Sequence, residues 1–170
     1  MTFGKFLVLL TVTFCFCSGC AGQKKPDGMP DLFPCQITIT QNGTPLEGAA
    51  VIIFPKTGGS NGWNTTGLTN ANGVAELMTH NDFKGAPAGE YVVMVTKTEL
   101  SPSAVPDKAP TDPVEYEKWD MVKRSETRTT YRLVKAEFGV ANLTPHSITV
   151  SQGKNEATFD VGEPIKEEMK

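Results

Sequence analysis

The sequence has few of the residues from which catalytic and metal sites are built. It contains only two histidines, His80 and His146, which are far apart, and no H-E-x-x-H pattern. No serine or cysteine stands in a motif that pairs it with a histidine base. We therefore expect no catalytic residues, no metal and no cofactor. The alternative is a secreted metal-dependent enzyme that uses one of these histidines with a tyrosine or a carboxylate.

Clusters of basic residues are also missing. The net charge is −3 over 170 residues, and the only adjacent basic pairs are Lys24-Lys25 and Lys123-Arg124. A surface that follows a phosphate backbone needs many more cations gathered together. We therefore expect no nucleic-acid partner.

Long hydrophobic runs are absent after the N-terminus. There, Lys5 precedes the apolar run FLVLLTVTFCF at residues 6–16, and the small residues Ser18 and Gly19 follow it. The run is too short to span a bilayer but has the length of a signal-peptide core. Residues 1–19 are therefore predicted to be a secretory signal.

Three of the four cysteines, Cys15, Cys17 and Cys20, lie in or just after this signal. The stretch CSGCAG resembles a bacterial lipobox, in which small residues precede a cysteine that is acylated and becomes the mature N-terminus. Cys17 departs from that pattern, because a larger aliphatic residue is usual there. The resemblance implies lipid attachment at Cys20 and a lipoprotein anchored outside the cytoplasm, on the periplasmic face or the cell surface. Ordinary cleavage that discards all three cysteines is the alternative.

Residues 20–34 contain proline and glycine and little apolar periodicity, which predicts a flexible tether. The folded domain is predicted to begin at Cys35, where strand alternation places Cys35, Ile37 and Ile39 on one face. We expect Cys35 to be a buried and unreactive thiol, with a reactive thiol or an intermolecular disulfide as the alternative.

From residue 35 to residue 162 the chain consists of short strand-like runs separated by Gly, Asn and Pro turns. Such a pattern predicts an all-β sandwich. Residues 49–55 are apolar throughout, which predicts a strand covered on both faces. The predicted strands are 36–41, 49–55, 74–79, 91–98, 127–134, 146–151 and 156–161. The expected core is Ile37, Ile39, Val51, Ile53, Leu77, Tyr91, Val93, Val95, Leu133, Ile148, Val150, Phe159 and Val161.

Residues 99–126 interrupt the spacing of these strands. Four prolines exclude a central strand there, and residues 115–124 are expected to form a helical turn or two. The segment is predicted to be a Pro-rich crossover on the surface of the sandwich, and residues 163–170 a charged tail. In the turn at 69–73, Asn70 is expected to hydrogen-bond the backbone two residues on, and Asn72 and Gly73 to tolerate positive φ.

Three segments together resemble carboxypeptidase regulatory-like domains: GTPLEGAAVIIFP, GLTNANGVAEL and APAGEYVVMV, in the family's order. Residues 129–161 are similar to the closing strands of small secreted lipoproteins of planctomycete-type bacteria. The resemblance implies a seven-stranded, transthyretin-like (prealbumin-like) sandwich. A domain of this family accompanies peptidases and is not itself catalytic. The implied function is a non-catalytic, lipid-anchored module of the cell envelope with a binding or structural role.

Two tryptophans are the candidate ligand-binding residues. Trp63 lies in a Gly/Asn-rich loop and Trp119 in the segment 99–126. An exposed indole can stack on a sugar ring or dock a protein. A carbohydrate-recognition module is therefore an alternative function, and a tryptophan that only covers an end of the sandwich is the simpler interpretation. The expected partners are the membrane, through the lipid, and an unknown envelope protein or polysaccharide.

Overall fold

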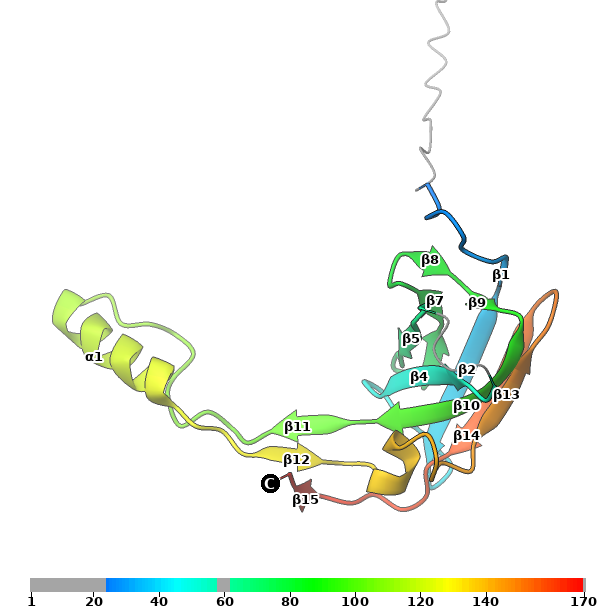
Figure 1. Ribbon diagram of the computed structural model, residues 1–170. Coiled ribbons are helices and arrows are strands. Elements are labelled where there is room, and N and C mark those ends of the chain that lie inside the picture. The colour runs from blue at the N-terminus through cyan, green and yellow to red at the C-terminus, as the bar shows by residue number, and fades with distance from the viewer. Residues whose placement is uncertain (1–23, 58–61, 170) are drawn as a thin grey trace, which may run out of the picture.

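The computed structural model describes residues 24–57 and 62–169, and this part of the chain is mostly β-structure with one α-helix (Figure 1). The strands are β1 (Leu32–Phe33), β2 (Cys35–Gln41), β3 (Thr44–Pro45), β4 (Ala50–Pro55), β5 (Thr65–Leu68), β6 (Val74–Glu76), β7 (Met78–Thr79), β8 (Phe83–Lys84), β9 (Ala86–Pro87), β10 (Gly89–Thr96), β11 (Thr98–Leu100), β12 (Thr130–Arg132), β13 (Ser147–Val150), β14 (Asn155–Asp160) and β15 (Glu167–Glu168). The helices are α1 (Pro113–Ser125) and the 3₁₀ helix η1 (Ala136–Gly139).

Two sheets enclose the core. One has the strand order β13-β10-β4-β5-β7-β8, and the other has β14-β2-β3 with β6 also paired to β2. Each contributes one apolar face through strict alternation, so that Ile37 and Ile39 of β2 and Val93 and Val95 of β10 are fully buried. The prediction of a mostly β chain with two packed sheets is confirmed.

The expected strand 74–79 is in fact two strands that belong to different sheets. β6 pairs with β2, whereas β7 pairs with β5. Between them Leu77 is buried, its N–H donates to the Cys35 carbonyl, and its carbonyl accepts from Gly85. A continuous run of residues with strand propensity thus carries the chain from one sheet to the other.

The prediction of strands within the sandwich was wrong at two places. Residues 65–68 were not among the predicted strands but form β5, which pairs with both β4 and β7. Residues 127–134 were read as a sandwich strand, but β12 spans only three residues and pairs with β11 and β15. In the segment around β12, Val134 and not Leu133 enters the core. Phe159 of β14, which was also predicted to be in the core, is only partly buried against it.

Strand pairing holds both ends of the folded domain in place. The end of the predicted tether forms β1, which pairs with β9, so ordered structure begins before Cys35. At the other end β14 runs parallel to β2, although β13 just before it lies in the opposite sheet. Asn155 fixes this change of sheet, because its side-chain amide donates to the carbonyls of Ser151 and Pro34 and its oxygen accepts from the Ser151 N–H.

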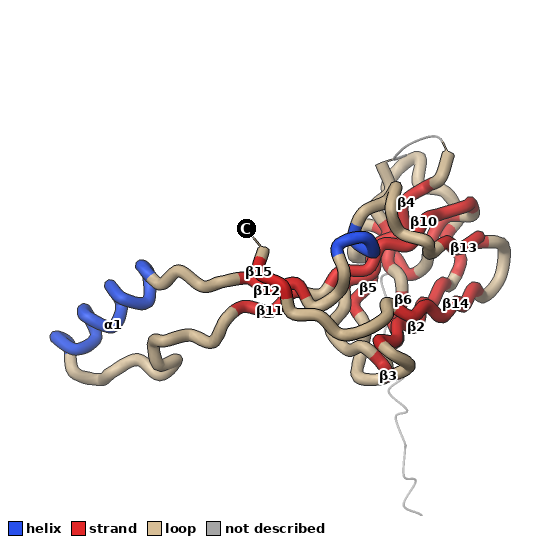
Figure 2. The backbone as a smooth tube through the Cα atoms, turned by 90° about the horizontal axis from the view of Figure 1, so that it is seen from below, coloured by secondary structure: helices blue, strands red, loops and turns tan. Residues whose placement is uncertain are grey.

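Residues 99–126 do not lie on the surface of the sandwich as expected. β11 and β12 form an arm that leads away from the two sheets and carries α1 at its far end (Figures 1 and 2). The expected turn or two of helix is a helix of 13 residues. The charged tail contributes β15 to the base of the arm, where Lys166 forms a salt bridge with Glu99 at 3.6 Å.

Candidate functional site

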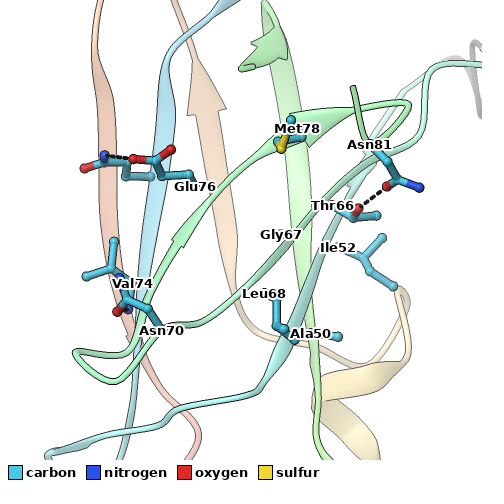
Figure 3. Close-up of a pocket in the computed structure, with 11 residues that line it drawn as sticks. Ala50, Ile52, Thr66, Gly67, Leu68, Asn70, Val74, Glu76, Met78 and Asn81 are labelled. Carbon is cyan, nitrogen blue, oxygen red and sulfur yellow. Dashed lines mark hydrogen bonds between the residues drawn. The ribbon is translucent and has the colours of Figure 1, made fainter. Parts of the chain in front are cut away.

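A groove with a cavity volume of about 790 Å³ lies where β4, β5 and β6 come together (Figure 3). Val74 and Glu76 of β6 form one side, Ala50 and Ile52 of β4 stand on the other, and Met78 closes one end. The described residues that line the groove are Gln36, Ala50, Ile52, Thr66, Gly67, Leu68, Asn70, Val74, Glu76, Met78 and Asn81.

The apolar wall of the groove follows from the composition of β4. Val51 and Ile53 point into the core, and the alternate residues Ala50 and Ile52 point into the groove. A strand that is apolar on both faces was expected to be covered on both faces. The second face is instead only partly buried, and Leu68 of β5 beside it is 67% exposed.

Gly67 allows β5 and β6 to approach closely at the floor of the groove. A Cβ on Gly67 would come within 2.9 Å of the Glu76 carbonyl oxygen and 3.0 Å of Leu77 Cδ2. Real Cβ atoms do not make such contacts without a shift of the backbone. The glycine is therefore required by packing, because a Cβ there would point toward the buried Leu77 and Ala75.

Five of the eleven described lining residues are polar, and four of them are hydrogen-bonded to one another. Thr66 Oγ1 donates to Asn81 Oδ1 at 3.2 Å, and Gln36 Nε2 donates to Glu76 Oε1 at 3.5 Å. Among the described residues of the lining, Glu76 is the one that is ionisable. Its salt bridge with Lys84 is long, at 3.8 Å, and exposed. A single carboxylate among aliphatic side chains is suited to binding an apolar surface that carries a cation.

Asn70 shapes the mouth of the groove through the turn that precedes β6. Its Oδ1 accepts hydrogen bonds from the N–H groups of Asn72 and Val74, at 2.9 and 3.1 Å, as the sequence predicted for the first of these. Gly73 adopts φ +73°, whereas Asn72 is not among the residues with positive φ. The reversal therefore needs one left-handed residue rather than two.

The two candidate tryptophans lie on different parts of the molecule. Trp63 is half-buried just before β5, with its ring centroid 4.9 Å from that of His80, whose Nε2 is 2.8 Å from the Gly62 carbonyl. Trp119 lies on α1, where its Nε1 donates to the Pro106 carbonyl at 2.8 Å. The two indoles therefore do not form one stacking platform, and neither lines the groove. Recognition of a sugar by either one alone stays a prediction.

The proposed lipid-attachment residue Cys20 and the signal at residues 1–19 lie outside the described residues. In residues 24–57 and 62–169, no helix has the length and apolar character needed to cross a membrane. Cys35 is buried, as predicted, and burial raises the pKa of its thiol to about 11. A thiol with so high a pKa is a poor nucleophile at neutral pH.

Neither histidine belongs to a metal-binding cluster within the described chain, where no group of three or more His, Cys, Asp and Glu side chains could hold an ion. His146 is stacked between Phe138 and Phe159, at centroid distances of 5.1 and 4.7 Å. Its Nε2 is buried and has no hydrogen-bond partner in the described structure. Burial lowers the pKa of His146, and a hydrogen bond to the Asp160 backbone and the Asp160 charge partly oppose this.

We expect the protein to lose stability in mild acid because of His146. Its pKa is lower in the folded state than the ordinary value of about 6.5, so the unfolded chain binds the proton more readily. Stability should be constant above about pH 6.5 and fall as the pH drops through the folded pKa. Urea unfolding at pH 7.5 and 5.0 measures this. The variant His146→Phe should show a smaller drop between the two pH values than wild type. An equal drop in His146→Phe would contradict the assignment.

Comparison of the sequence with protein-family models and with curated proteins found no match. Among solved structures, the chain is similar to a D312A variant of BcpA, the major pilin subunit of Bacillus cereus, at 18% sequence identity and a TM-score of 0.39. The match covers 78% of this chain and 30% of the pilin chain.

Proposed function

We propose that this protein is a non-catalytic, lipid-anchored β-sandwich module of the bacterial cell envelope with a binding role. The observation that carries the binding role is the groove, in which aliphatic side chains stand partly exposed around the single carboxylate of Glu76. An exposed apolar concavity with few polar groups is typical of a surface that binds another molecule. An envelope protein or a polysaccharide is the expected class of partner.

The finer fold that we propose is a seven-stranded, transthyretin-like sandwich of the carboxypeptidase regulatory-like type. The number of longer strands supports it, because seven strands of three or more residues remain among the described residues once the arm is set aside. They are β2, β4, β5, β6, β10, β13 and β14. The hydrogen bonds of Asn70 and the positive φ of Gly73 further support the turn on which part of the resemblance rests.

The anchoring part of the proposal rests on the sequence around Cys20. Expression of the full chain in a bacterial host with labelled palmitate should give a labelled protein in the membrane fraction. Cys20→Ser should abolish the label, because the acylated thiol is gone, and Cys17→Ser should retain it. Label that persists in Cys20→Ser, or that is lost only in Cys17→Ser, would overturn lipid attachment at Cys20.

A further inference from the structure

The arm presents a helix that its own chain does not cover. α1 has no buried residue and lies at the far end of the β11–β12 pair, away from both sheets (Figures 1 and 2). Isolated helices of this length are marginal in water, and most helices in proteins are stabilised by packing of an apolar face. A helix of 13 residues with so little packing needs another source of order.

Part of that order is local, since the segment before α1 folds back onto one face of the helix. Asp112 caps the N-terminus by accepting from the N–H groups of Val114 and Glu115. Trp119 and Lys123, four residues apart, contact the returning chain through the Pro106 carbonyl and the Asp107 carboxylate. These contacts fix the orientation of α1 at the tip of the arm.

The opposite face of α1 is apolar and exposed. Val114, Met121 and Val122 have relative exposures of 61%, 70% and 52%. With Lys118 they occupy positions i, i+4, i+7 and i+8, which share one face of a helix. No salt bridge to Lys118 is formed in the described part of the chain. The face is therefore an apolar ridge with one unpaired cation at its centre.

A lipid surface fits this ridge poorly. α1 carries three acidic and three basic residues, and helices that lie on anionic membranes are strongly basic. The acidic residues are Glu115, Glu117 and Asp120, and the basic residues are Lys118, Lys123 and Arg124. A protein surface with an apolar concavity and one carboxylate is the better complement.

The groove of the sandwich is such a surface. Aliphatic side chains form much of its lining, and Glu76 is the one ionisable group among its described residues. An apolar ridge that carries Lys118 therefore matches the groove in both polarity and charge. The Glu76–Lys84 salt bridge is exposed and long, at 3.8 Å, and therefore contributes little. Lys118 can replace Lys84 as the partner of Glu76 at small cost.

We propose that α1 of one copy of this protein binds in the groove of a second copy. The inference deepens the proposed binding role, on which it rests, by naming the partner. Within one chain the arm holds α1 away from the sandwich, so the contact forms between copies (Figure 2). A single helix in a groove is a small interface, and a reciprocal exchange of arms about a twofold axis doubles it.

Directed cross-linking tests the contact. Two full-length variants, Met121→Cys and Leu68→Cys, carry tags of different size and are mixed under oxidising conditions; each retains the native Cys35, which is buried. The expected product joins the two tags in one disulfide-linked dimer, because Met121 and Leu68 lie in the ridge and the groove. Leu143→Cys is the matched control, since Leu143 is similarly exposed, at 59%, and does not line the groove. Cross-linking no greater than with this control overturns the proposal.

A charge exchange tests the pairing of Lys118 with Glu76 without a covalent trap. Analytical ultracentrifugation should show wild-type dimers, and Lys118→Glu should weaken the dimer at least tenfold. Adding Glu76→Lys to Lys118→Glu should restore most of the affinity, whereas Glu76→Lys alone should also weaken it. A monomeric wild type, or a dimer that none of these variants changes, overturns the inference. Either result leaves palmitate labelling at Cys20 untouched, so failure here is distinct from failure of the proposed anchoring.

Discussion

Replacing Gly73 with alanine is expected to destabilise the protein by more than about 3 kcal/mol. Gly73 has φ +73°, and a Cβ there would press against the Ile39 carbonyl oxygen and lie 3.2 Å from the Leu46 nitrogen. The Leu46 N–H donates a hydrogen bond to the Ile39 carbonyl at 3.0 Å, and the Ile39 N–H donates to the Gly73 carbonyl at 2.8 Å. The added methyl group therefore opposes both a left-handed conformation and the pairing beside β2.

Gly43 provides the matched control for this substitution. It has nearly the same conformation, with φ +75°, but a Cβ there would meet nothing within 4 Å. Gly43→Ala should lower the free energy of unfolding by only about 1–2 kcal/mol, the cost of holding alanine in a left-handed conformation. Urea unfolding followed by far-UV circular dichroism gives both values. Equal losses for the two variants would show that the close approach of Gly73 to β2 contributes nothing.

Ile37→Ala is expected to cost about 3–4 kcal/mol of unfolding free energy. Ile37 is fully buried in the middle of β2, and its direct neighbours across the sheet are Ala157 on β14 and Ala75 on β6. These small side chains cannot fill the space that the deleted atoms leave, so a cavity remains. Since domains are stable by only about 5–15 kcal/mol, the loss is a large part of the total.

The comparison variant for Ile37 is Leu143→Ala. Leu143 is exposed and lies outside the core, so its truncation should change stability by no more than about 0.5 kcal/mol. Urea titrations of both variants should show similar slopes and a much lower midpoint for Ile37→Ala alone. A loss of unfolding free energy below about 1 kcal/mol for Ile37→Ala would contradict this expectation, because it would mean that neighbouring side chains move to fill the cavity.

The candidate site was only partly visible in the sequence. The apolar run at 49–55 signalled two apolar faces on β4, and the structure shows that Ile52 on the second face lines the groove. Most of the residues that complete the groove come from β5 and β6, and β5 was not among the predicted strands. The two candidate tryptophans, Trp63 and Trp119, do not line the groove. A groove between strands depends on which strands become neighbours, and no local pattern encodes that.

Alternation and turn chemistry in the sequence determined the buried face of each long strand and the reversal at Gly73. These are local properties, because each depends on a few consecutive side chains and on backbone conformations that only some residues adopt. Tertiary structure decided the exchange of sheets at Leu77, the parallel pairing of β14 with β2, and the projection of residues 99–126 as an arm. Each of these features depends on a partner strand that is distant in the sequence. Backbone hydrogen bonds can form with several alternative strands, and side-chain packing determines which strand is the partner.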